Sequence, residues 1–269
     1  MSPYARPMPA DSDRTPPGFD AVVARLRAAG CVFAEDEARL ILDEASDSTQ
    51  LEDFIARRVA GEPLEYILGW AEFCGLRVSV APGVFVPRQR TTLLVREALR
   101  VAPRAPVVLD LCCGAGAIGA AILAARTDAA VYAADIDEAA TECARRTLGT
   151  DHIYTGDLYE PLPDSLRGRV DVIVANAPYV PTDEIRLMPP EAREHEALAA
   201  LDGGGDGLAL HRRVAAGALE WLSTCGYVLI ETSRRQASAT AGILVAAGFS
   251  TAIVRDDDVD GTVAVGRHR

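Results

Sequence analysis

Residues 107–119, VVLDLCCGAGAIG, decide the fold. The apolar run predicts a buried strand, Gly114 and Gly116 predict a tight turn, and the residues that follow predict a helix. A glycine-rich turn between a strand and a helix lets a ligand approach the backbone at the helix N-terminus. Asp135 ends the next predicted strand about twenty residues later, where folds of this kind bind a ribose. The stretch therefore predicts a nucleotide-type cofactor at this turn.

Strands and helices alternate from residue 105 to the C-terminus. Strands are predicted at 106–111, 129–136, 169–176 and 226–232, and helices at 116–126, 137–148 and 206–222. Residues 248–269 predict two further strands around the acidic turn DDDVD. This alternation predicts an α/β fold with a doubly wound, Rossmann-like parallel sheet and an antiparallel C-terminal hairpin.

The residues before this domain follow other patterns. Residues 1–18 are rich in proline and lack an apolar segment, so we expect a disordered leader and no secretory signal. Residues 19–70 predict a small N-terminal helical domain, in which Ser48 or Thr49 would cap the helix that ends near residue 61. Residues 71–88 alternate apolar and polar side chains and predict a β-hairpin connector, which leaves 89–269 for the large domain.

Composition limits the classes of function. The net charge of −12 argues against nucleic acid as a direct partner, since such affinity comes mostly from phosphate neutralisation. The six cysteines form no Cys-x-x-Cys pair and the four histidines have no metal-binding spacing, so we expect a reduced cytoplasmic protein without a metal. No run of eighteen apolar residues is present, so we expect no membrane span. We also expect a monomer.

Two cofactor classes fit the glycine-rich turn. GAGAIG has the Gly-x-Gly-x-x-Gly spacing of dinucleotide-binding proteins, with Gly119 as the third glycine, so a nicotinamide cofactor is one alternative. Asp110 favours the other class, because a carboxylate four residues before Gly114 would repel a pyrophosphate but suits the cationic methionyl end of S-adenosylmethionine. Asp-x-x-x-Gly-x-Gly resembles motif I of the class I methyltransferases. That resemblance implies that Asp157 lies near the adenine and that Leu158 lines the ring.

The tetrapeptide Asn176-Ala177-Pro178-Tyr179 follows a predicted strand at the carboxyl edge of the sheet, where open α/β sheets bind their ligands. The Asn176 Oδ1 and the carbonyl of Ala177 can each accept one N–H of a planar NH2 group, on which Tyr179 can stack. The segment resembles the Asn-Pro-Pro-Tyr motif of amino-methyltransferases that act on adenine, guanine and glutamine amides. Ala177 replaces the first proline and adds a backbone N–H, and we expect Pro178 to keep the geometry. A plain Asn-x-Pro turn with a packed tyrosine is the structural alternative.

Four further stretches resemble the HemK/PrmC-type protein-(glutamine-N5) methyltransferases, over residue 20 to the end of the chain. They are GEPLEYILGWAEFCGLRVSVAPGVFVPRQRTTLLV (61–95), LDLCCGAGAIGAAI (109–122), EHEALAALDGGGDGLALHRR (194–213) and LIETSRRQ (229–236). With NAPY in place of NPPY, the chain resembles a divergent branch. The resemblance implies an S-adenosylmethionine-dependent methyltransferase domain at 89–269 that methylates the glutamine amide in the Gly-Gly-Gln loop of a peptide chain release factor. S-adenosylhomocysteine would be the second product.

The resemblance also implies two sets of site residues. The acceptor would be held by Asn176, Ala177, Pro178 and Tyr179. The cofactor would be held by Arg88, Thr91, Asp110, Leu111, Cys112, Gly114, Gly116, Asp135, Ile136, Asp157, Leu158 and Asn176, with Pro87 beside Arg88. Glu196 can equally be a structural hydrogen-bonding residue, and we expect His195 to be a loop histidine outside the reaction. No strong general base is evident.

Several departures from the family pattern keep other functions open. Thr92 stands where the family has a glutamate, Gln89 where it has a proline, and Ala197 where a proline follows the glutamate. The helical domain is also short between Glu44 and Leu51. One alternative is therefore a small-molecule amide or amine N-methyltransferase of a biosynthetic pathway. Another is a cofactor-binding protein without turnover. A nucleic-acid methyltransferase is disfavoured by the acidic charge.

Overall fold

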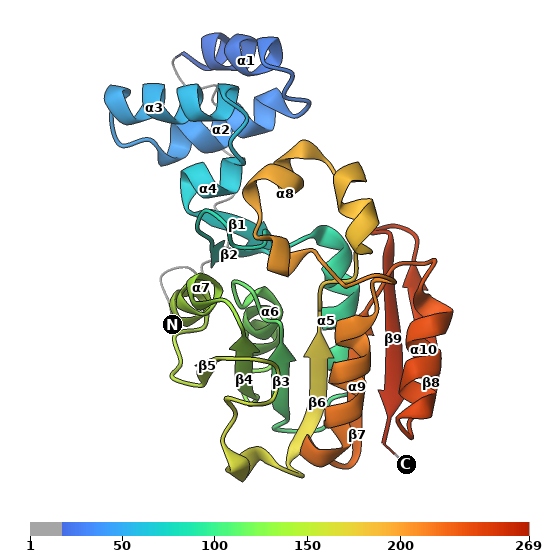
Figure 1. Cartoon of the computed structure of the whole chain (residues 1–269). Coiled ribbons are helices and arrows are strands. Elements are labelled where there is room, and N and C mark those ends of the chain that lie inside the picture. The colour runs from blue at the N-terminus through green and yellow to red at the C-terminus, as the bar shows by residue number, and fades with distance from the viewer. Residues whose placement is uncertain (1–17, 269) are drawn as a thin grey trace.

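The computed structural model describes residues 18–268, so the expected leader lies outside the described residues except for Gly18. The first part of the chain forms a helical unit that projects beyond one end of the large sheet (Figure 1). Its helices are α1 (Phe19–Ala28), α2 (Ala34–Glu44), α3 (Ser48–Val59) and α4 (Leu64–Leu68). Leu26, Ile41 and Ile55 belong to an apolar core within this unit. The unit therefore has a packed interior of its own.

The cap of α3 differs from the prediction. The Asp47 carboxylate accepts hydrogen bonds from the backbone N–H groups of Thr49 and Gln50, both at 2.9 Å. Asp47 has the extended backbone of an N-cap, whereas Ser48 is already the first helical residue. The expected cap at Ser48 or Thr49 is therefore wrong.

A small antiparallel hairpin of β1 (Trp70–Phe73) and β2 (Leu76–Ser79) joins the helical unit to the large domain. Its turn residues Cys74 and Gly75 both have positive φ, 52° and 73°, as a two-residue hairpin turn requires. A hydrogen bond of 3.0 Å from the Ser79 backbone N–H to the Thr147 hydroxyl fastens β2 to helix α7 (Glu138–Leu148).

The large sheet has seven strands in the order β5-β4-β3-β6-β7-β9-β8. The first five of these run parallel, and β9 is antiparallel to both of its neighbours. The predicted doubly wound fold with an antiparallel C-terminal hairpin is confirmed. The strands are β3 (Val107–Leu111), β4 (Ala130–Asp135), β5 (Ile153–Thr155), β6 (Val170–Ala175), β7 (Leu222–Glu231), β8 (Ser250–Asp256) and β9 (Gly261–Arg267).

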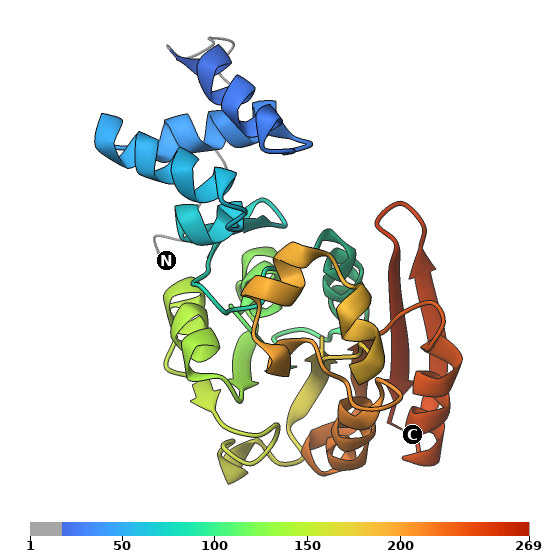
Figure 2. The same cartoon turned by 45° about the horizontal axis from the view of Figure 1, so that its top comes forward.

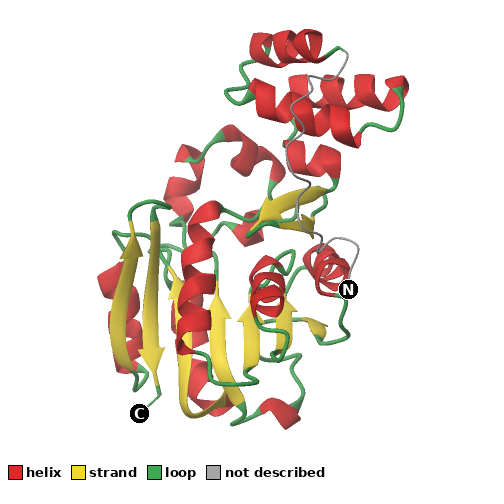
Figure 3. Ribbon diagram, turned by 180° about the vertical axis from the view of Figure 1, so that it is seen from behind, coloured by secondary structure: helices red, strands yellow, loops and turns green. Residues whose placement is uncertain are grey.

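Helices cover both faces of this sheet, which Figures 1 and 3 show from opposite sides. Val108 and Val174 pack on the face of α5 (Thr92–Val101) and α6 (Ala117–Ala125). Their neighbours Leu109 and Ile173 pack on the face of α9 (Ala209–Trp221) and α10 (Ala237–Ala246). Strands buried on both faces need apolar side chains at nearly every position, which explains the continuous apolar runs in the sequence.

The carboxyl ends of the parallel strands meet at one edge of the sheet. The segment that follows β6 lies beyond this edge and contains η3 (Thr182–Leu187), α8 (Pro190–His195) and η4 (Leu198–Ala200) (Figure 2). The short helix η1 (Gln89–Thr91) leads into α5, and η2 (Asp164–Leu166) precedes β6. Within residues 18–268 no helix has both the length and the apolar character that crossing a membrane requires.

Candidate active site

The turn between β3 and α6 contains two glycines with different tasks. Gly114 and Gly116 both have positive φ, 53° and 77°. A Cβ on Gly116 would lie 3.0–3.2 Å from atoms of Leu148 and Ala144, so this glycine permits close packing against α7. A Cβ on Gly114 would meet no atom within 4 Å, so open space lies beside its backbone. A ligand can approach the turn at Gly114.

Asp110 is a buried carboxyl group just before this turn. Its Oδ2 accepts a hydrogen bond of 3.1 Å from the Gly119 backbone N–H, and burial raises its pKa to about 7. Its Oδ1 has no hydrogen-bond partner among the described residues. A buried, unpartnered carboxylate oxygen is costly, and a cationic ligand group would relieve that cost.

The second candidate acid, Asp135, ends β4 and accepts hydrogen bonds from the backbone. Its carboxylate accepts hydrogen bonds from the N–H groups of Gly114, at 2.8 Å, and Asp137, at 3.0 Å. Each oxygen keeps a lone pair for a further donor such as a ribose hydroxyl. Ile136 follows with its side chain 62% exposed, an apolar surface that a purine ring would cover.

The remaining cofactor candidates divide by what their side chains contact. Asp157 pairs with the Arg213 guanidinium at 2.7 Å, so its carboxylate already has a partner. Leu158 is buried with φ of 51°, and Cys112 is half-buried with φ of 54°. Leu111 lies wholly in the apolar layer beneath α9, so only its backbone can meet a ligand.

These residues fit the charge and shape of S-adenosylmethionine. Asp110 has an orphaned oxygen for the cationic methionyl end, Gly114 gives backbone access, and Asp135 has acceptors for a ribose. Among residues 18–268, no group of three or more His, Cys, Asp and Glu side chains could hold a metal ion.

The end of the connector is tied to the segment beyond β6. The Arg88 guanidinium forms an ion pair of 2.6 Å with the buried carboxylate of Glu196, which also accepts from the Val86 backbone N–H at 3.3 Å. Burial raises the pKa of Glu196 and Arg88 opposes this effect. Arg88 and Glu196 therefore fasten two segments together at the site.

Asn176, the first residue after β6, contacts Thr91 at the end of η1. The Asn176 Nδ2 donates to the Thr91 hydroxyl at 3.4 Å, and Thr91 is buried. Tyr179 donates its hydroxyl to the Glu231 Oε1 at 3.3 Å. Burial, and then the charge of Glu231, raise the pKa of Tyr179 to about 12, so this hydroxyl is protonated at neutral pH. The acceptor candidates Asn176 and Tyr179 thus share one polar cluster with Thr91 and Glu231.

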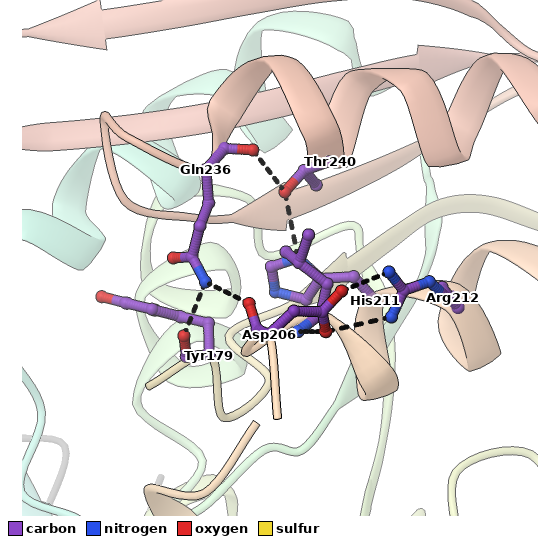
Figure 4. A network of polar contacts seen from close by, with 7 residues as sticks. Tyr179, Asp206, His211, Arg212, Gln236 and Thr240 are labelled. Carbon is purple, nitrogen blue, oxygen red and sulfur yellow. Dashed lines mark hydrogen bonds and ion pairs between the residues drawn. The ribbon is translucent and has the colours of Figure 1, made fainter. Parts of the chain in front are cut away.

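The loop from Asn176 to Tyr179 is held by residues that lie far away in the sequence. The Gln236 Nε2 donates to the backbone carbonyls of Tyr179, at 2.9 Å, and Asp206, at 3.2 Å (Figure 4). The backbone N–H of Gly203 donates to the carbonyl of Val180 at 2.8 Å. A Cβ on Gly203 would lie 2.8 Å from the Pro178 carbonyl oxygen, so the two backbones touch. The loop at residues 203–207 therefore packs directly against the candidate acceptor loop, whose Ala177 is fully buried.

Some site features were not predicted from the sequence. Glu231 and Gln236 lie in the quoted segment LIETSRRQ, but no role was assigned to either. The spacing of an acid and an amide around a strand-to-helix turn was the available signal.

His195 ends α8 and lines a surface pocket with Arg58 and Gly61 beside the helical unit. No contact of the His195 side chain with the acceptor loop is found among the described residues.

Comparisons with known proteins agree on a methyltransferase. The family model Methyltransferase small domain matches residues 75–216. The chain is 40% identical to the release factor glutamine methyltransferase of Geobacter sulfurreducens over 207 residues, which are 76% of this chain and 72% of that protein. It is 34% identical to the 4-amino-L-phenylalanine/4-methylamino-L-phenylalanine methyltransferase of Streptomyces pristinaespiralis over 225 residues, 80% and 76% of the two chains. Its fold is similar to that of a methyltransferase from Pyrococcus furiosus, with a TM-score of 0.55 and 16% identity over 80% of this chain and 98% of that one.

Proposed function

The chain belongs to the HemK/PrmC-type family of protein-(glutamine-N5) methyltransferases, and we propose that it methylates the side-chain amide of a glutamine in a peptide chain release factor. The acceptor would be the glutamine of the Gly-Gly-Gln loop. Bound S-adenosylmethionine supplies an electrophilic methyl group on a sulfonium. On transfer the amide nitrogen would bond to the methyl carbon, the electrons of the broken C–S bond would stay on sulfur, and the proton released from the nitrogen would pass to water.

The observation that carries this proposal is the arrangement of Asn176. Its NH2 group donates to Thr91, which leaves its carbonyl oxygen free to accept an N–H from the substrate amide. The carbonyl of Ala177 would accept the second N–H, and Tyr179 would stack on the amide plane. An amide nitrogen is a poor nucleophile because its lone pair is delocalised. Two acceptors aimed at its hydrogens favour the charge that develops on nitrogen in the transition state.

The cofactor would lie along the ends of β3 and β4. Asp110 would face the cationic methionyl end, Gly114 would give backbone access, and Asp135 would bind the ribose. Ile136 and Leu158 would flank the adenine, with Asp157 near its edge. Arg88 would close this end through its ion pair with Glu196. We propose that the protein acts as a monomer in the cytoplasm, where it would meet a release factor.

The test is mass spectrometry of a release factor after incubation with the protein and S-adenosylmethionine. We expect a mass gain of one methyl group on the Gly-Gly-Gln peptide. Asn176→Ala should bind the cofactor in calorimetry but leave the peptide unmodified, because the NH2 group of the substrate glutamine has lost a hydrogen-bond acceptor. Full turnover by Asn176→Ala would reject the amide clamp. An unmodified peptide with the wild-type protein, despite cofactor binding, would reject the release factor.

A second candidate is an amine N-methyltransferase acting on a small aromatic molecule. The relative that acts on 4-amino-L-phenylalanine is 34% identical over 80% of this chain, and an aryl NH2 group offers the same two hydrogens to the clamp. Incubation with 4-amino-L-phenylalanine, in parallel with the release factor, separates the two. Methylation of the amine alone would favour this candidate.

A further inference from the structure

We propose that Glu231 is the positioning residue of the acceptor site, and that it orients Asn176 through the Thr91 hydroxyl while it also holds the hydroxyl of Tyr179. The inference rests on the proposed function and adds to it the group that decides which way the Asn176 amide faces. Sequence reasoning found no strong base at this site, and the structure reveals a buried carboxyl group that contacts the acceptor residue Tyr179.

The sheet brings these groups together. Ala175, the last residue of β6, is paired with Ile230 of β7, so Asn176, directly after β6, lies level with Glu231, the last residue of β7. Side chains alternate between the two faces along a strand, so Asn176 and Glu231 lie on the face of Val174 and Leu229, which pack with α5. The helix η1 precedes α5 and places Thr91 over this point. Thr91, Asn176 and Glu231 therefore meet although they are far apart in the sequence.

Hydrogen-bond chemistry gives this cluster a direction. An ionised carboxylate can only accept, so Tyr179 donates to the Glu231 Oε1 at 3.3 Å. Burial raises the pKa of Glu231, and a hydrogen bond from Thr91, the charge of Arg90 and the Tyr179 hydroxyl oppose the effect. Thr91 has one hydroxyl proton, and in the proposed network it donates that proton to Glu231. Its oxygen then accepts from the Asn176 Nδ2 at 3.4 Å.

The Asn176 carbonyl oxygen is thereby left for the substrate. Both distances are long for hydrogen bonds, and such contacts commonly tighten when the substrate binds. The Glu231 Oε2 is buried and has no hydrogen-bond partner among residues 18–268, so it is available to accept a hydrogen bond as the cluster tightens. A neutral amide at this position would offer a proton as well as accept one, and Asn176 would lose its fixed orientation.

Glu231→Gln is the test, because it keeps the shape and removes the charge. We expect kcat for methylation of the release factor, or of 4-amino-L-phenylalanine, to fall about 100-fold while cofactor affinity is unchanged. Thr91→Val should show a similar loss, Thr91→Ser a smaller one, and the double variant Thr91→Val/Glu231→Gln no more than either single variant. Glu97→Gln is the matched control, since Glu97 is a buried glutamate on α5 that pairs with Arg100.

A second readout does not depend on turnover. The side-chain NH2 signals of Asn176 in NMR spectra, identified by their loss in Asn176→Ala, should shift in Glu231→Gln and Thr91→Val but not in Glu97→Gln. Unshifted signals in Glu231→Gln, wild-type kcat, or losses that multiply in the double variant would overturn the positioning role. If the wild-type protein methylates neither substrate, the proposed function fails, and the NH2 signals still decide the role of Glu231.

Discussion

Replacing Gly207 by alanine should disturb the acceptor loop without touching any catalytic side chain. Gly207 has φ of 72°, and a Cβ there would overlap the Tyr179 carbonyl oxygen and the Gln236 Nε2. The first of these atoms is backbone, so relief requires the loop after Asn176 to move. Gly205 lies two residues earlier, and a Cβ on it would meet nothing within 4 Å. Gly205 also lacks a positive φ, so the same substitution at the two positions separates the left-handed backbone and close packing of Gly207 from a general effect of losing a glycine.

The expected loss of stability follows from two contributions. An alanine in the left-handed region costs about 1–2 kcal/mol. Losing the hydrogen bond from Gln236 to the Tyr179 carbonyl costs about 0.5–1.5 kcal/mol. The smaller entropy of an unfolded chain with alanine offsets about 0.4–1 kcal/mol. Gly207→Ala should therefore lower the free energy of unfolding by about 0.5–3 kcal/mol, or the Tm by about 1–12 °C.

Thermal unfolding and initial rates together test this reasoning. Gly207→Ala should also lower kcat at least about 10-fold, because small displacements of catalytic groups are costly. Gly205→Ala should match the wild-type protein in both measurements. Wild-type stability and rate in Gly207→Ala, or equal damage in Gly205→Ala, would show that the close contact does not hold the acceptor loop.

Two further predictions concern the cofactor side. The pKa of about 7 for Asp110 means that the carboxyl loses its charge as pH falls through 7. Only the ionised form attracts a cation, so calorimetry should show that affinity for S-adenosylmethionine falls with decreasing pH below about 7 and is constant above it. Asp110→Asn should bind S-adenosylmethionine weakly at every pH. Arg88→Met leaves the buried Glu196 carboxylate without its ion pair, and urea unfolding should show a loss of about 1–3 kcal/mol. The double variant Arg88→Met/Glu196→Gln should recover part of the lost free energy of unfolding.

The order of strands and helices could be predicted because short local sequence patterns determine it. The apolar runs ending at Leu111 and Ala175 and the glycines at 114 and 116 identify strands and a turn without knowledge of the rest of the chain. The short strand β5 has three residues and too little alternation to be recognised. Strand β7 starts at Leu222, before the predicted residue 226, because Leu222 pairs with Val170 ahead of a register shift.

The partners of the site residues could not be predicted in the same way. Thr91 lies 85 residues from Asn176, and Glu231 lies 52 residues from Tyr179. Which side chains meet depends on the register of β6 with β7 and on the position of η1 above them. The motif containing Glu231 was recognisable in the sequence, but its contact with Tyr179 depends on tertiary structure. Local sequence therefore predicts the acceptor tetrapeptide and leaves the groups that orient it unassigned.

Ala177 illustrates how tertiary contacts can replace a local restraint. A proline in its place would restrict the unfolded chain and stabilise the loop by about 0.4–1 kcal/mol. The loop here is held by bonds from Gln236 to the Tyr179 carbonyl and from Gly203 to the Val180 carbonyl, at 2.9 and 2.8 Å. Each contributes about 0.5–1.5 kcal/mol, so together they exceed what the proline ring would add. The carbonyl of residue 177 belongs to the backbone in either case. The departure from Asn-Pro-Pro-Tyr therefore does not by itself argue against the amide clamp.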